Sequence, residues 1–227
     1  MTSPPPLLFD TYYHIDNRGN NREDIFIQER NYYHFLNLYG KYIEPIAETF
    51  AYCLLKNHFH CLVRIKSENE IIETLKTLKV SPANSRSAMH RSLPSQQPGQ
   101  TTKPLGSLYP SRQFSNLFNA YAKAINAAYG RTGSLFQHPF GRVMVTNTSQ
   151  FFQVIIYIHQ NPQKHGFVDD FREWKYSSYD TLLSEKPTQL KRDQVFEWVG
   201  GKQQYIDLHS EWISEQQSKA FANTDNE

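Results

Sequence analysis

Hydrophobic and polar positions follow two periodicities along this chain, and together they predict a mixed α+β fold. Runs rich in β-branched and aromatic residues predict strands at residues 7–15, 50–55, 58–65 and 142–145. Apolar residues at helical spacing predict helices at residues 30–44, 68–79, 114–129 and 149–161. This order of elements favours a ferredoxin-like antiparallel sheet with helices on one face.

Polar clusters and prolines set the expected ends of these elements. The stretch 16–21 is rich in Asp, Asn and Gly, so a turn is expected after the first strand. Lys56 and Asn57 predict a tight connection between the second and third strands. Pro162 is expected to end a helix at Asn161, because the residue before a proline is pushed out of the α region.

A proline-rich stretch divides the chain. Residues 81–110 are rich in Ser, Gln and Pro, and they predict a mobile insertion. Residues 81–113 carry no acidic side chain, and their basic residues are Arg86, Arg91, Lys103 and Arg112. We therefore expect one domain over residues 1–180 with a flexible basic insertion, and a C-terminal helical extension over 181–227 with a frayed end.

Composition narrows the function classes. Of 227 residues, 39% are hydrophobic and 14% aromatic, which excludes a chain that is disordered throughout. No apolar run reaches the roughly 18 residues of a membrane span, and no secretory leader is expected. The two cysteines, Cys53 and Cys61, are too few to staple a fold of this size, so a cytoplasmic location is expected. The net charge of +2 alone does not identify a partner.

Two histidines on one predicted strand are the first candidate for chemistry. Side chains alternate faces along a strand, so His58 and His60 point the same way while Phe59 points into the opposite layer. Two imidazoles one residue apart can reach the same divalent cation. The alternative is a pair of exposed histidines without a ligand.

A tyrosine and an asparagine on a predicted helix are the second candidate. Tyr157 and Asn161 are four residues apart, so they share one helix face. Taken alone, Tyr157 could be a core aromatic and Asn161 a helix terminator. Taken with His58 and His60, they offer two nitrogens and one oxygen to a metal, a set that suits Mg²⁺ or Mn²⁺ acting on phosphate. The hydroxyl of Tyr157 can then act as a nucleophile.

Five segments carry a resemblance to a known family. They are residues 12–21 (YYHIDNRGNN), 51–63 (AYCLLKNHFHCLV), 133–137 (GSLFQ), 157–166 (YIHQNPQKHG) and 174–179 (WKYSSY). In combination they resemble the single-tyrosine transposases of the HUH endonuclease superfamily, and above all the REP-associated tyrosine transposases and their insertion-sequence relatives. The resemblance implies the HUH endonuclease fold, with Tyr157 as the nucleophile and His58, His60 and Asn161 as metal ligands.

The resemblance also implies an activity. Such a protein would cleave single-stranded DNA beside a hairpin, form a 5′-phosphotyrosine intermediate, release a 3′-hydroxyl and later join strands. The alternative is a domesticated protein that binds DNA hairpins and no longer cuts. A replication initiator is a further alternative, although no phosphate-binding loop of the helicase type occurs in the chain. Both a homodimer and a monomer are compatible with the family.

Further polar residues are weaker candidates for DNA contacts. Arginine and lysine are the usual phosphate contacts, and polar side chains follow the first predicted strand. The set is Asn17, Arg18, Asn20, Arg131, Arg142 and Lys164. His14 either lies beside the metal or is a satisfied histidine of the sheet.

Overall fold

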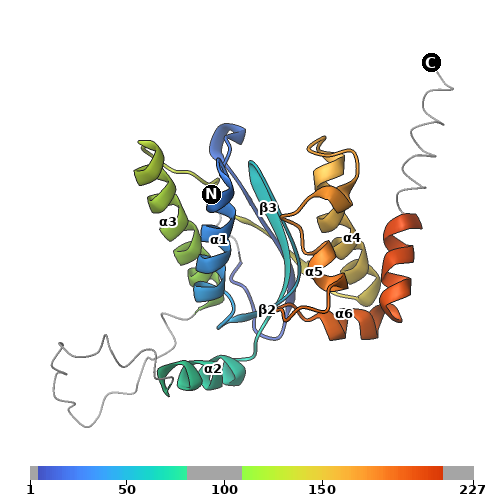
Figure 1. The fold of residues 1–227 in the computed structure, drawn as a ribbon. Coiled ribbons are helices and arrows are strands. Elements are labelled where there is room, and N and C mark those ends of the chain that lie inside the picture. The colour runs from blue at the N-terminus through green and yellow to red at the C-terminus, as the bar shows by residue number, and fades with distance from the viewer. Residues whose placement is uncertain (1–4, 81–108, 212–227) are drawn as a thin grey trace, which may run out of the picture.

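The computed structural model describes residues 5–80 and 109–211, and its centre is a four-stranded antiparallel sheet (Figure 1). The strand order is β2-β3-β1-β4, with the first strand inside the sheet. The strands are β1 (Tyr12–Arg18), β2 (Ala47–Leu55), β3 (His58–Ile65) and β4 (Gly141–Val145). This order, with α1 and α3 as the connecting helices, is the ferredoxin-like arrangement, so the predicted α+β fold class is confirmed.

Two helices, α1 (Glu29–Tyr42) and α3 (Pro110–Tyr129), cover one face of the sheet. Their local signals are clear. A capping box formed by Gln28 and Asn31 begins α1, and Pro110 stands in the first turn of α3. Ile15 and Phe59 from the sheet enter the same core as the aromatic side chains of these helices. This core lies on the far side of β3 from His58 and His60.

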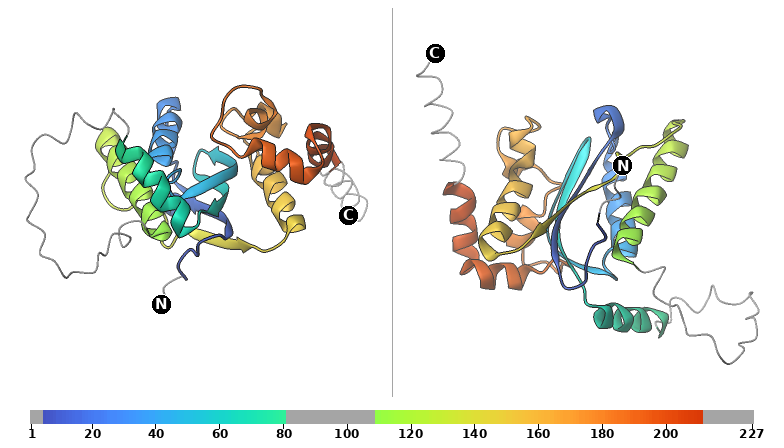
Figure 2. Two further views of the ribbon diagram at one scale, coloured as in Figure 1. Left: turned by 90° about the horizontal axis from the view of Figure 1, so that it is seen from below. Right: turned by 180° about the vertical axis from the view of Figure 1, so that it is seen from behind.

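The C-terminal helices cover the opposite face (Figures 1 and 2). These elements are α4 (Thr148–Lys164), the short 3₁₀ helix η3 (Phe171–Glu173), α5 (Tyr179–Leu183), α6 (Arg192–Val199) and helical residues 202–211. Leu62 of β3, Ile155 of α4 and Tyr205 share a second core. The predicted placement of helices on one face therefore holds for α1 and α3, but it is incomplete. The physical reason is that β2 and β3 are buried on both faces, so elements of the chain must cover both.

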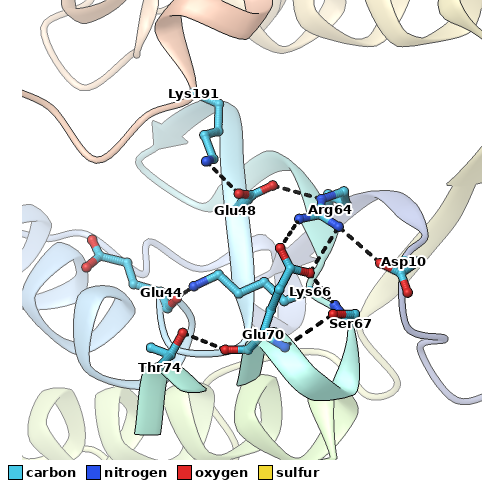
Figure 3. A network of polar contacts seen from close by, with 9 residues as sticks. All are labelled: Asp10, Glu44, Glu48, Arg64, Lys66, Ser67, Glu70, Thr74 and Lys191. Atoms are coloured by element: carbon cyan, nitrogen blue, oxygen red, sulfur yellow. Dashed lines mark hydrogen bonds and ion pairs between the residues drawn. The ribbon is translucent and has the colours of Figure 1, made fainter. Parts of the chain in front are cut away.

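An ionic network ties α2 (Glu68–Val80) to the sheet (Figure 3). Arg64 of β3 forms ion pairs with Asp10, Glu48 and Glu70. Glu48 also pairs with Lys191, which precedes α6. The network around Arg64 therefore connects β2, β3 and the start of α2, and it reaches Lys191 through Glu48.

Two element ends differ from the prediction. The expected turn at residues 16–21 begins later, because Asp16 pairs with His60 on one side and with Gly141 on the other, and pairing on both sides outweighs turn propensity. The helix expected to end at Asn161 continues through Pro162 to Lys164. Pro162 lies in the last turn of α4, so its missing N–H and its ring disturb only the end of the helix.

Other predictions on chain organisation have mixed outcomes. Cys53 and Cys61 are buried free thiols on neighbouring strands, where Cys53 pairs with His60 and Cys61 with Tyr52. The predicted insertion lies outside the described residues except for its last two positions, and so does the predicted frayed end. The division at residue 180 stays a prediction. Among the described helices, none has the length and apolar character needed to cross a membrane.

Candidate active site

The two histidines of β3 lie on the face that α4 covers, and both are almost fully buried. His58 is 3% exposed and His60 is 7% exposed. The Nε2 atom of each ring is buried and has no hydrogen-bond partner among the described residues. Buried ring nitrogens are normally paired, so these two free atoms are the first sign of a ligand site.

The Nδ1 atoms of the same rings are engaged. Nδ1 of His58 lies 2.6 Å from Oδ1 of Asn57, and Nδ1 of His60 lies 3.0 Å from Nε2 of His14. A carbonyl oxygen can only accept, so Nδ1 of His58 donates and its Nε2 keeps a lone pair. Burial lowers the pKa of His58 to about 3 and the pKa of His60 well below its usual value. Both rings are therefore neutral at neutral pH, the state that binds metals.

Tyr157 of α4 lies against these histidines. Its ring meets those of His14 and His60 edge-on, with centroids 5.7 Å and 5.5 Å away. The side chain is partly exposed. Lys164, two turns further along α4, places Nζ 5.1 Å from the centre of the Tyr157 ring. A reachable hydroxyl thus stands beside buried imidazoles and an ammonium group.

Asn161 is fully buried one turn beyond Tyr157. Its Nδ2 donates to the backbone oxygen of Tyr157 at 2.7 Å, which fixes the orientation of the amide. Its Oδ1 is buried and has no partner among the described residues. The continuation of α4 past Pro162 keeps Asn161 inside the helix and on the face of Tyr157. The three buried atoms without partners among the described residues, on His58, His60 and Asn161, are of the kinds that bind divalent cations such as Mn²⁺.

The structure adds two residues that the sequence did not select as ligands. One donor atom from each of His14, Asp16 and His60 lies within 4.8 Å of the others. Burial lowers the pKa of His14 to about 4 and raises the pKa of Asp16. His14 was considered as a neighbour of the metal, but Asp16 was expected in a turn. The signal that could have found it is the alternation of His14 and Asp16 along β1.

The six predicted DNA contacts do not gather in one place. Lys164 lies over Tyr157, and the charge of Arg18 acts on His58. Arg131 forms an ion pair with Glu23. Asn20 donates to the backbone of Ser134 at 3.0 Å. These contacts tie two of the candidates to the loops of the fold itself.

The remaining two candidates are also engaged within the fold. Arg142 pairs with Ile15 in the sheet register, which places it on the face opposite the histidines, and its guanidinium lies 3.8 Å from the centre of the Phe140 ring. Asn17 is 3% exposed, and its Oδ1 accepts from the backbone of Arg18. Of the six, only Arg18 and Lys164 lie beside the candidate site.

A buried polar chain anchors α4 from behind. His159, between Tyr157 and Asn161 in sequence, contacts Nε2 of His209 at 2.9 Å through Nδ1 and Oγ of Ser178 at 2.8 Å through Nε2. His209 Nδ1 donates to the backbone oxygen of Tyr205. Burial lowers the pKa of His209 to about 4, so its ring is neutral at neutral pH. Because Nδ1 of His209 donates, its Nε2 accepts, and the donor of the bond between the two histidines is Nδ1 of His159. The helical residues 202–211 are thus bonded to the helix that carries Tyr157.

Comparisons with known proteins bear on the family resemblance and on the fold. No family model matches the chain. The chain is 24% identical over 132 residues to a Haemophilus influenzae protein named "Putative REP-associated tyrosine transposase", a match that covers 58% of each chain. The chain therefore spans less than two thirds of that relative. A solved structure of a REP-associated tyrosine transposase bound to a REP hairpin matches with a TM-score of 0.51 at 17% identity, over 82% of this chain and 88% of that one. The predicted resemblance to the REP-associated tyrosine transposases is thereby confirmed, and the chain shares their fold.

Proposed function

We propose that this chain is a metal-dependent endonuclease and strand transferase that acts on single-stranded DNA beside hairpins, with Tyr157 as its nucleophile. One observation carries the proposal. Nε2 of His58, Nε2 of His60 and Oδ1 of Asn161 are buried acceptors without partners in the described part of the chain. The partly exposed Tyr157 ring lies against His60, at a centroid distance of 5.5 Å. This combination serves phosphoryl chemistry and has no evident purpose in packing.

The proposed metal is Mg²⁺ or Mn²⁺, held by His58, His60 and Asn161. When bound, a divalent cation polarises a phosphoryl oxygen and orients the leaving group. Asn57 and His14 keep the two imidazoles in position through their Nδ1 atoms. Lys164 and Arg18 supply positive charge that attracts the phosphate backbone.

The proposed reaction forms one bond and breaks one. The hydroxyl oxygen of Tyr157 bonds to the phosphorus and loses its proton, while the bond from phosphorus to the 3′ oxygen breaks and that oxygen takes up a proton. The product is a 5′-phosphotyrosine and a free 3′-hydroxyl. A phenolate leaves more easily than an alkoxide, so the covalent bond remains active enough for a later hydroxyl to displace the tyrosine and join strands.

The experiment is a cleavage assay on single-stranded hairpin oligonucleotides drawn from DNA that flanks the gene. Wild-type protein is incubated with Mn²⁺ or Mg²⁺, and the products are separated on a denaturing gel. We expect a covalent protein–DNA adduct that needs the metal and disappears in Tyr157→Phe and in His58→Ala. Tyr33→Phe is the matched control, because Tyr33 is 55% exposed on α1, away from the site.

A second outcome would identify the rival function. Specific hairpin binding without an adduct, under both metals, would contradict the nuclease and support a domesticated DNA-hairpin-binding protein. The solved relative, described as bound to a REP hairpin, makes hairpin DNA the substrate of choice for both readings. An adduct that survives in Tyr157→Phe would contradict the assignment of the nucleophile alone.

A further inference from the structure

A carboxylate faces the candidate metal site from the neighbouring strand. Asp16 of β1 is the direct register partner of His60 on β3. Directly opposite residues of antiparallel strands share a face and have Cβ atoms about 4.5–5.5 Å apart. The donor atoms of His14, Asp16 and His60 accordingly lie within 4.8 Å of one another. Asp16 therefore stands at the border of the site, on the side away from His58.

The position of this side chain depends on a glycine. Gly141 of β4 is the partner of Asp16 on the other side of β1. A Cβ atom at position 141 would lie 2.2 Å from Oδ1 of Asp16, which no real contact allows. The carboxylate thus occupies the space that a side chain at 141 would take. The backbone of Gly141 is not in the left-handed region, so glycine is needed here because the Asp16 carboxylate fills the space of a side chain, not because of the backbone conformation.

The carboxylate has no partner of its own. Within the part of the chain that the structure describes, no hydrogen bond and no ion pair of the Asp16 side chain is found, and only the more distant charge of Arg18 acts on it. Asp16 is partly buried. A carboxylate withdrawn from water without a donor or a cation is unfavourable, so a cation bound beside Asp16 would stabilise its charged form.

The geometry points to Asp16 as an anionic oxygen ligand of the metal that we assign to His58, His60 and Asn161. This inference rests on the proposed function and adds a residue to it. The three other ligands are neutral, so the carboxylate would offset one of the two charges of the cation and favour a hard ion such as Mg²⁺ or Mn²⁺. Adjacent ligands with bonds of about 2.1 Å lie about 3 Å apart, and the donor atoms of His14, Asp16 and His60 already lie within 4.8 Å of one another.

The test is a calorimetric titration of the full chain with Mn²⁺ in the absence of DNA. We expect Asp16→Asn to weaken Mn²⁺ binding at least about tenfold, and His60→Ala to abolish it. Asp10→Asn is the matched control, because Asp10 lies just before the same strand but pairs with Arg64 and is 63% exposed. Its Mn²⁺ affinity should equal that of the wild type. Far-UV circular dichroism without metal checks that each variant is folded.

A second variant moves the same carboxylate by changing its neighbour Gly141 on β4. Gly141→Ala should displace Asp16 and weaken Mn²⁺ binding, and it should have no further effect in the Asp16→Asn background. Wild-type affinity in Asp16→Asn, together with lost binding in His60→Ala, would overturn this inference and leave the proposed function standing. Absence of Mn²⁺ binding by the wild type would overturn the metal site itself, and this inference with it.

Discussion

At the scale of single residues, the site depends on which nitrogen of each histidine is free. The sequence predicted His58 and His60 as a pair because strand alternation alone places them on one face. It could not predict that Asn57 and His14 engage the Nδ1 atoms, since these contacts arise from a turn conformation and from the register between β1 and β3. Register is set by the whole sheet, and no local pattern reports it.

Asn57 offers a test at this scale. Asn57→Ala removes the acceptor that orients His58, so Mn²⁺ affinity should fall about 10–100-fold, as is typical when a hydrogen-bond partner of a metal ligand is lost. Asn57→Asp keeps an oxygen at the same place and should keep most of the affinity. Calorimetric titration measures both variants. Equal affinities in Asn57→Ala and the wild type would show that Asn57 does not position His58.

At the scale of elements, α4 carries the proposed nucleophile, and the helical residues 202–211 hold α4 in place. Sequence periodicity predicted α4, but not its extension beyond Pro162 or its partner helix at residues 202–211. The bond from His159 to His209 joins residues 50 positions apart, and the amphipathic pattern of either helix says nothing about such a bond. Long-range polar contacts of this kind are where prediction from the sequence failed.

His209→Leu tests the anchor of α4. The substitution leaves the buried Nδ1–H of His159 with only the longer contact to the Tyr205 hydroxyl, at 3.3 Å, which should lower the free energy of unfolding by about 1–3 kcal/mol. Urea unfolding at pH 7.5 gives the value. Ser210→Ala is the matched control on the same helix, since the hydroxyl of Ser210 is exposed and bonds only to the backbone of Ile206. A loss equal to that of the control would contradict the anchor.

The ion pair between Arg64 and Glu70 gives a second test at the scale of elements. The hydrogen bond from Arg64, opposed by partial burial and aided by Ser67, lowers the pKa of Glu70 from 4.5 to about 2. A lowered carboxyl pKa stabilises the fold above pH 4.5, and this contribution is lost as the pH falls toward 2. Glu70 is 43% exposed, so solvent limits the effect to about 0.5 kcal/mol.

Glu70→Gln keeps one side-chain oxygen to accept from the backbone of Ser67 at the start of α2, and it removes the charge together with the second oxygen that accepts from Arg64. We expect it to be slightly less stable than the wild type at pH 7 and equally stable near pH 2, measured by urea unfolding across that range. Glu73→Gln serves as control, because Glu73 pairs only with exposed Lys76 on the same helix. A pH-independent difference between Glu70→Gln and the wild type would contradict the electrostatic account.

At the scale of the whole molecule, the sheet separates two cores with different tasks. The core under α1 and α3 holds the ferredoxin-like frame together, while the core under α4 carries the candidate site at its border. The frame was predictable because its apolar pattern follows regular periods. The second core was harder to predict, because it joins sheet residues such as Phe50 and Leu62 to α4 and to short elements as far as Tyr205, and only tertiary packing decides where those short elements lie.

This second core makes the molecule sensitive to acid. Burial lowers the pKa of His209 to about 4, so the folded chain cannot take up a proton that the unfolded chain binds below pH 6.5. Stability is therefore complete above pH 6.5 and falls as the pH approaches 4, with a loss from His209 of about 2 kcal/mol at pH 5. Among the described residues, the rings of His159, Phe171, Tyr179 and Tyr205 contact His209, and no acidic group acts on it to stabilise its charged form. Urea unfolding of the wild type at pH 7.5 and pH 5 should show the loss, and His209→Leu should show a smaller one; an equal loss in both would place the acid sensitivity elsewhere in the fold.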